Sequence, residues 1–277
     1  MSFGARLDHA LAERGSLCVG IDPHAALLIQ WGLADDLVSL ERFSLTCVEA
    51  FADVAAVLKP QSAFFERFGS RGIAILEKTI VAARDAGALV LLDVKRGDIG
   101  STMAAYADAY LDPSAELAVD AITVSPYLGV GSLQPAFDLA AIHDAGVFVL
   151  GLTSNKEGPE IQHARVADGR TVAQSIIDDL GIRNADAQPL GALGVVVGAT
   201  IGDSVADLSG LNGPILVPGI GAQGGTAEDV RRIFGSALPA ILPSVSREVL
   251  RHGPSVAALR DAAQRAIDEF AFLRRSG

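Results

Sequence analysis

The chain has 277 residues, half of them apolar, which is enough for one large core. Its 22 Lys and Arg residues are outnumbered by 33 Asp and Glu residues, giving a net charge of −11 at pH 7. This charge repels a polyanion, so nucleic acid is not an expected partner. The amino-terminal segment lacks an apolar core of signal-peptide length, and glycines interrupt the longer apolar runs. We therefore expect a cytoplasmic protein that does not bind a membrane.

Short runs of Val, Ile and Leu recur along the chain, each followed by a segment with helical spacing of its apolar residues. This alternation predicts βα units around a parallel sheet. Strands are predicted at 17–22, 54–59, 88–95, 121–125, 147–152, 193–199, 215–219 and 240–244. Helices are predicted at 5–14, 37–52, 70–86, 102–110, 133–144, 171–180, 203–208, 226–234 and 255–273.

Eight strands alternating with eight helices fit a single α/β domain, a closed (β/α)8 TIM barrel over residues 1–277, with the helix at 5–14 covering its bottom. A doubly wound open sheet is the alternative, and it usually has a Gly-rich turn directly after its first strand. Here that turn reads Gly20-Ile21-Asp22-Pro23-His24 and has no GxGxxG pattern, which favours the barrel.

The cysteines and histidines do not indicate a metal site. Cys18 and Cys47 are the only cysteines, and both lie in apolar segments, so two buried thiols are expected rather than a disulfide. The histidines are scattered without ligand spacing, which indicates surface or capping roles. They are His9, His24, His143, His163 and His252.

The segment 88–102 reads ALVLLDVKRGDIGST, and its apolar first part is typical of a strand buried on both faces. Asp93 and Lys95 are two residues apart at the end of that strand, so both side chains leave the same face. Asp98 follows in the loop. Burying both signs of charge costs desolvation, which fits either a functional site or an ion pair that plugs the barrel mouth.

Side chains at the carboxyl ends of barrel strands converge on one mouth, and polar residues collect at these ends. They are Asp22, Lys59, Asp93, Lys95, Ser125, Thr153, Ser154, Asn155 and Thr200. Four charged residues can form a row of alternating sign, namely Lys59, Asp93, Lys95 and Asp98. Carboxylates in such a row keep the ammonium groups protonated. A fixed, protonated lysine is suited to stabilise and then protonate a carbanion.

The last two predicted strands are followed by a candidate phosphate site. Residues 217–225 read VPGIGAQGG, in which glycines let backbone N–H groups approach an anion closely. Arg247 follows the last strand at a helix start, and the loops after strands seven and eight are where such barrels commonly hold a phosphate. The alternative is a hinge beside a surface arginine.

These motifs resemble those of the orotidine 5'-phosphate decarboxylase family. DVKRGDI is similar to its DxKxxDI signature, and Pro218 to Gly225 is similar to its PGIGAQGG loop. The resemblance extends to Gly20-Ile21-Asp22-Pro23, Lys59 and Ser125-Pro126-Tyr127, and so runs from the first strand to Arg247. The length and the TSN-containing loop resemble the longer bacterial branch of the family.

The resemblance implies a homodimeric barrel that converts orotidine 5'-monophosphate to UMP and CO2, the last step of de novo pyrimidine synthesis, without a metal or cofactor. Lys95 would protonate C6, Asp93 would face the departing carboxylate, and Lys59 would order the charge row and touch the ribose. Asp98 and Thr102 would reach the active site of the neighbouring subunit.

The resemblance also implies substrate contacts. Asp22 would bind a ribose hydroxyl, Ser154 the pyrimidine edge, and Gln223 both base and phosphate. Arg247 would hold the phosphate together with the loop that contains Pro218, Gly219 and Gly221. Two departures from the family pattern bear on these contacts. TSNKEG replaces the expected TSNPG, which leaves Thr153 as an alternative to Ser154, and Ser246 stands where relatives often have glycine.

Two other functions are compatible with parts of this pattern. A magnesium-dependent sugar-phosphate decarboxylase or aldolase of the same superfamily carries a similar DxKxxD, but it needs an acid at the end of strand two. Lys59 occupies that position and repels a cation. The second alternative is a phosphate-binding module without catalysis, which would not need the electrostatic cost of the charge row.

Overall fold

The computed structural model describes residues 1–201, 206–221, 224–235 and 240–273. Within them, eight parallel strands pair in chain order and close into a barrel, because β1 pairs with both β2 and β8. The strands are β1 (Cys18–Ile21), β2 (Val57–Pro60), β3 (Leu89–Arg96), β4 (Ala121–Val124), β5 (Gly146–Leu152), β6 (Leu193–Val197), β7 (Ile215–Val217) and β8 (Ile241–Val245). The predicted TIM barrel is confirmed.

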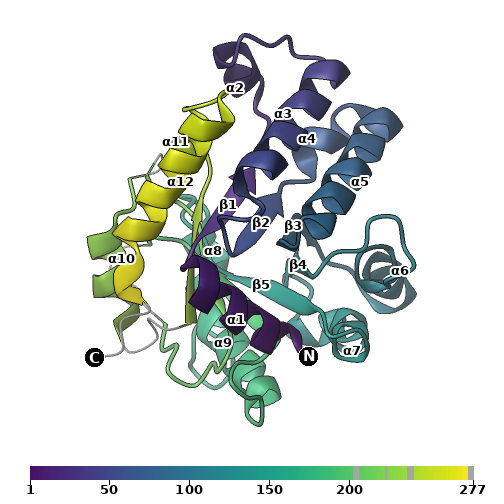
Figure 1. Ribbon diagram of the computed structural model, residues 1–277. Helices are drawn as coiled ribbons and strands as arrows, with labels where there is room; N and C mark the ends of the chain where they lie inside the picture. Colours follow the sequence, from purple (N-terminus) through teal and green to yellow (C-terminus); the bar gives the residue numbers. More distant parts are fainter. Residues whose placement is uncertain (202–205, 222–223, 236–239, 274–277) are drawn as a thin grey trace.

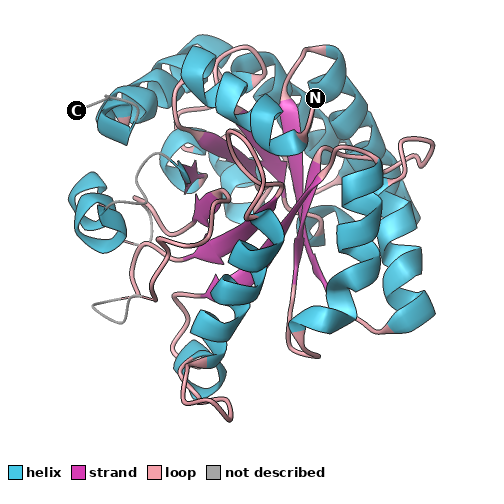
Figure 2. Cartoon of the chain, turned by 90° about the horizontal axis from the view of Figure 1, so that it is seen from below, coloured by secondary structure: helices cyan, strands magenta, loops and turns pink. Residues whose placement is uncertain are grey.

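Helices surround the strands, as Figures 1 and 2 show. The longer ones are α1 (Phe3–Arg14), α3 (Leu37–Phe51), α5 (Gly69–Asp85), α6 (Gly100–Leu111), α7 (Gln134–Ile142), α9 (Val172–Asn184), α10 (Ala227–Phe234) and α12 (Val256–Glu269). Short helices that the sequence pattern did not predict are α2 (Ala25–Gln30), α4 (Ala63–Glu66) and α8 (Gly158–Gln162). The helix start predicted at Arg247 is confirmed, since α11 (Arg247–Leu250) begins there. The 3-10 turns within the described residues are η1 (Val130–Leu133) and η3 (Ala271–Leu273).

Two apolar layers hold this arrangement together. One lies between the outer faces of the strands and the surrounding helices. The other fills the lower barrel, where Phe3, Leu7 and Leu11 of α1 pack with inward-facing strand residues such as Leu91 and Phe148. The lower barrel is therefore a packed core, which leaves the opposite end for a cavity.

Two element predictions need correction. The helix predicted at 203–208 is wrong over 206–208, which are not helical, and 203–205 lie outside the described residues. The Gln174 side chain of α9 accepts a hydrogen bond from the N–H of Asp207 and donates one to the Asp207 carbonyl. The backbone of Asp207 is therefore bonded to α9 and does not form the hydrogen bonds of a separate helix. The strand predicted from Val54 begins at Val57, because the N–H groups of Val54 and Ala55 donate to Phe51 and form a turn.

The structure also bears on the predictions that both thiols are buried and that the chain does not bind a membrane. Cys18 and Cys47 are both free and buried, as predicted. Across the described ranges, each helix is too short or too polar to cross a bilayer.

Candidate active site

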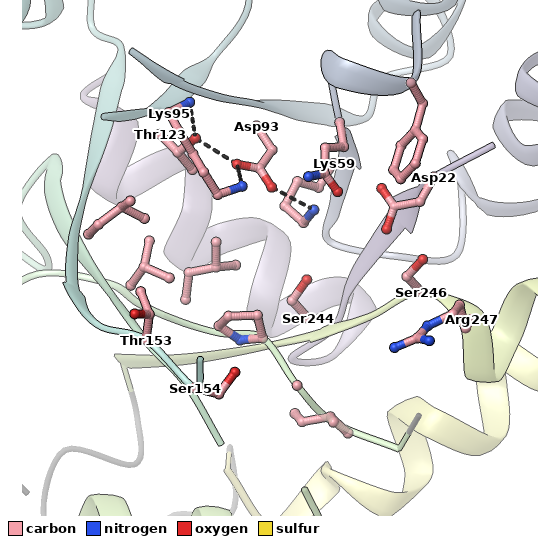
Figure 3. A pocket seen from close by; sticks show the side chains of 18 of the residues that line it. Asp22, Lys59, Asp93, Lys95, Thr123, Thr153, Ser154, Ser244, Ser246 and Arg247 are labelled. Carbon is pink, nitrogen blue, oxygen red and sulfur yellow. Dashed lines mark hydrogen bonds and ion pairs between the residues drawn. The ribbon is translucent and has the colours of Figure 1, made fainter. Parts of the chain in front are cut away.

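A cavity of about 440 Å³ lies at the carboxyl ends of the strands. Since these ends meet at one mouth of the barrel, side chains distant in sequence converge there. Nine of the residues predicted to bind or react with a ligand line this cavity (Figure 3). They are Asp22, Lys59, Asp93, Lys95, Thr153, Ser154, Pro218, Gly219 and Arg247.

The charge row is formed by three of its four predicted members. Lys59 Nζ lies 3.4 Å from Asp93 Oδ2, and Lys95 Nζ lies 2.6 Å from Asp93 Oδ1. The side chains of Lys59 and Asp93 are 7% and 10% exposed, whereas that of Lys95 is 44% exposed. The row therefore begins inside the barrel and ends in an ammonium group that reaches the cavity.

The row keeps its charges fixed. Burial disfavours ionisation of Asp93, but the ammonium groups of Lys59 and Lys95 outweigh it and lower the pKa of Asp93 to about 2. Burial would also lower the pKa of Lys59, but the carboxylates of Asp22 and Asp93 outweigh it and raise the pKa above its usual value. Asp93 is thus an anion and Lys59 a cation at neutral pH.

The other side of the cavity is suited to bind polar and anionic groups. Asp22 is buried, and its Oδ1 atom has no hydrogen-bond partner among the described residues. The same holds for Ser246 Oγ, which does not cap α11. Arg247, which begins α11, makes no ion pair with a described carboxylate and lies away from Lys95 in Figure 3. Buried polar atoms without partners are costly, so a ligand that bonds them is stabilised here.

Gly20 makes the approach of Asp22 and Ser246 possible. A Cβ atom at Gly20 would lie 2.8 Å from Ser246 Cβ and 2.9 Å from Asp22 Oδ2. Both contacts are too short for any side chain, so this corner of the cavity requires glycine.

Several predicted residues lie elsewhere. Asp98 does not join the charge row of its own chain, because its carboxylate accepts the N–H of Ile99 and makes no ion pair within the described residues. Thr102 is exposed on α6 and does not line the cavity. Gly221 does not line it either, and its N–H donates to Gly225. Gln223 lies outside the described residues. Three further strand-end residues that do not line the cavity are Ser125, Asn155 and Thr200.

The sequence pattern missed other residues that line the cavity. They include His24, Gln61, Phe64, Leu150, Thr123 and Ser244. Thr123 is the one most closely tied to the charge row, since its hydroxyl donates to Asp93 Oδ1 at 2.7 Å. A polar residue one position before the end of an otherwise apolar strand was the available signal. His24 precedes α2, and its ring packs against Phe64 with centroids 4.2 Å apart.

The donor set does not suit a divalent cation. No group of three or more His, Cys, Asp or Glu side chains within the described ranges is placed to hold one. Asp93 is the central carboxylate, and both of its oxygens are paired with ammonium groups. A cation at this place would meet two positive charges.

The closed barrel, with two lysine ammonium groups at the cavity in its mouth, has the architecture of a TIM-barrel enzyme. Residues 15–262 match the model of the orotidine 5'-phosphate decarboxylase / HUMPS family. The chain belongs to this family, and the expected membership is confirmed.

Individual relatives agree with the family match. The chain is 67% identical to an orotidine 5'-phosphate decarboxylase of Salinispora arenicola over 266 residues, 96% of each chain. It is 64% identical to that of Streptomyces coelicolor over 263 residues, 95% of each chain. A crystal structure from Streptomyces avermitilis has a TM-score of 0.96 at 60% identity and covers 98% of this chain and 95% of that one. Leishmania donovani OMP decarboxylase has a TM-score of 0.80 at 33% identity and covers 100% of both chains.

Proposed function

We propose that this chain decarboxylates orotidine 5'-monophosphate to UMP and CO2 in pyrimidine biosynthesis, and that Lys95 delivers the proton that replaces the carboxylate. The observation that carries this proposal is the row of Lys59, Asp93 and Lys95 on the cavity wall. Membership of the decarboxylase family supports it.

The chemistry requires a fixed positive charge. When the bond between C6 and the carboxylate carbon breaks, CO2 leaves and the electron pair remains on C6. This pair lies in the plane of the pyrimidine, where the ring π-system cannot delocalise it. The Lys95 ammonium stabilises the developing anion, transfers one proton to C6, and regains a proton from solvent. Asp93 holds that ammonium in place at 2.6 Å.

The remaining cavity residues bind the parts of the substrate that do not react. Asp22 accepts a hydrogen bond from a ribose hydroxyl through its unpartnered oxygen. Arg247 binds the phosphate, with Pro218 and Gly219 alongside it. Binding energy from the phosphate can be used to align the pyrimidine with Lys95, so these contacts contribute to catalysis as well as affinity.

The pyrimidine edge faces Thr153 and Ser154, which both line the cavity after β5. The Thr153 hydroxyl already bonds to Asn155 and to Gln162. We keep Ser154, the residue that the family motif indicates, as the contact to the pyrimidine, with Thr153 as the alternative. Gln223 remains a proposed contact to base and phosphate.

The active form is a homodimer in this proposal. Asp98 and Thr102 do not line the cavity of their own chain, so they are available to that of a neighbour. Apolar side chains are exposed on the loops after β3 and β4, where Ile99, Tyr127 and Leu128 are 61%, 75% and 52% exposed. A second copy of the chain would cover this apolar surface.

The test is an assay of the purified protein with orotidine 5'-monophosphate, followed by absorbance and by released CO2. We expect one CO2 for each UMP and the same rate with and without EDTA. Absence of CO2 release would refute the decarboxylase function, and inhibition by EDTA would favour the magnesium-dependent alternative.

The dimer has a separate test. Mixing inactive Lys95→Ala and Asp98→Ala subunits would create heterodimers in which one site carries both substitutions and the other carries neither. We expect activity to reappear after mixing, and sedimentation to report a dimer. A fully active monomer, or no recovery from dimers that have exchanged subunits, would contradict the shared site.

A further inference from the structure

Thr123 of β4 lies where the pairing between β3 and β4 is irregular. Leu92 of β3 pairs with Ile122 of β4, and Arg96 pairs with Val124. The three residues from Asp93 to Lys95 therefore stand opposite Thr123 alone, which is a bulge in β3. Asp93 and Lys95, at the two ends of this bulge, both line the cavity.

The backbone of Lys95 is strained within this bulge. Its φ angle is +46°, in the left-handed region that side chains other than glycine rarely adopt. Such conformations persist where the surroundings hold them, and they often occur at functional sites. The surroundings at this place include the Thr123 hydroxyl, which accepts the N–H of Lys95 at 3.0 Å.

The same hydroxyl donates to Asp93 Oδ1 at 2.7 Å (Figure 3). The direction of both bonds is fixed. A backbone N–H can only donate and an ionised carboxylate can only accept, so the single hydroxyl proton points to Asp93. Thr123 is 1% exposed, and its oxygen thus connects the backbone of Lys95 to the carboxylate that pairs with the Lys95 ammonium.

We propose that Thr123 is a positioning residue for the reaction: its hydroxyl holds the Lys95 backbone and the Asp93 carboxylate so that the Lys95 ammonium is aimed into the cavity. This inference rests on the proposed decarboxylase function. Without the hydroxyl, the Lys95 N–H and one Asp93 lone pair lose their partner, and Lys95 can relax towards an ordinary φ angle. The ammonium then moves relative to the reacting carbon.

The test compares Thr123→Val, which keeps the branched shape, with Thr123→Ser, which keeps the hydroxyl. We expect Thr123→Val to lower kcat about 10- to 100-fold, because small misplacement of a reacting group is costly, with little change in KM. Thr123→Ser restores most of kcat. Thr79→Val is the matched control, since Thr79 is also buried but its hydroxyl donates to the carbonyl of Ile75 within α5, away from the charge row. It should leave kcat unchanged.

Three results would overturn the inference while wild-type decarboxylation stands. One is wild-type kcat in Thr123→Val, the second is a Thr123→Ser variant as impaired as Thr123→Val, and the third is an effect confined to KM. If Thr123→Val does not fold, the Thr123→Ser variant decides, because a positioning hydroxyl predicts kcat near that of wild type. Failure of the wild type to release CO2 would instead refute the underlying function.

Discussion

The barrel carries an ion pair at each end, and the two differ in what their polar atoms bind. At the bottom, Arg6 pairs with Asp120, whose second oxygen accepts the N–H of Val90, and Arg6 also donates to the carbonyl of Asp144. These partners all belong to the protein. The pair therefore joins α1 to the amino ends of β3 and β4.

At the mouth, some of the charged groups are not fully paired with other groups of the described residues. Asp22 Oδ1 lacks a partner within the described ranges, the Lys95 side chain is 44% exposed, and Arg247 makes no ion pair with a described carboxylate. Polar groups that the protein leaves unsatisfied beside a cavity are available to a ligand. Substitutions at the mouth should therefore change catalysis, whereas substitutions at the bottom should change stability.

The largest effect is expected at Lys95. Lys95→Ala should lower kcat by about 10³-fold or more, because it removes both the positive charge and the proton donor. UMP binding should be largely retained, which calorimetry would measure. Lys78→Ala is the control, since Lys78 pairs with Glu41 on the surface. Turnover of Lys95→Ala near the wild-type rate would remove Lys95 from the mechanism.

Arg247→Ala comes next. Loss of a charged contact to phosphate should reduce kcat/KM about 100-fold, with kcat lowered as well as KM raised. Arg251 is a close control, because it lies one helical turn further, pairs with Glu248 and does not line the active-site cavity. Steady-state kinetics of both variants test this prediction. Equal losses in the two would show that Arg247 has no specific role.

At the bottom of the barrel, Asp120→Asn should have the opposite signature. It weakens the bond to Arg6, so we expect the free energy of unfolding to fall by about 2 kcal/mol while kcat is unchanged. Urea denaturation and steady-state kinetics on one preparation measure both quantities. A loss of kcat without a loss of stability would break the distinction between the two ends.

A further effect on stability concerns pH. The pKa of Asp93 is about 2, below its usual value, so its ionised form stabilises the fold above about pH 4. This contribution, on the order of 2 kcal/mol, is lost progressively as the pH falls from about 5 to below 2. The stability difference between wild type and Asp93→Asn should therefore shrink over that range in urea titrations. Parallel curves would show that the Asp93 pKa is not depressed.

Sequence reasoning could reach the barrel and most of the charge row because each rests on local signals. Apolar runs mark the strands, and the two-residue spacing of Asp93 and Lys95 places both on one face. Lys59 follows because parallel strands end at one mouth. These rules are independent of the detailed pairing of the strands.

The bulge and its partner could not be predicted in the same way. That three residues of β3 stand opposite Thr123 is a property of pairing between strands 28 residues apart, and no glycine or proline lies between Asp93 and Lys95. The position of Asp98 outside the charge row of its own chain has a related cause, since the chain at Gly97 packs closely on the Ser125 carbonyl. Tertiary contacts decide both positions.

Chemical modification at position 95 can show whether an ammonium group there performs the reaction. Lys95→Cys would introduce the one accessible thiol in the described part of the chain, because Cys18 and Cys47 are buried and burial raises the pKa of both, that of Cys18 to about 12. We predict that this variant is inactive and regains decarboxylation after aminoethylation with 2-bromoethylamine, but not after carbamidomethylation with iodoacetamide. Activity before modification, or equal recovery with the neutral amide, would contradict the account.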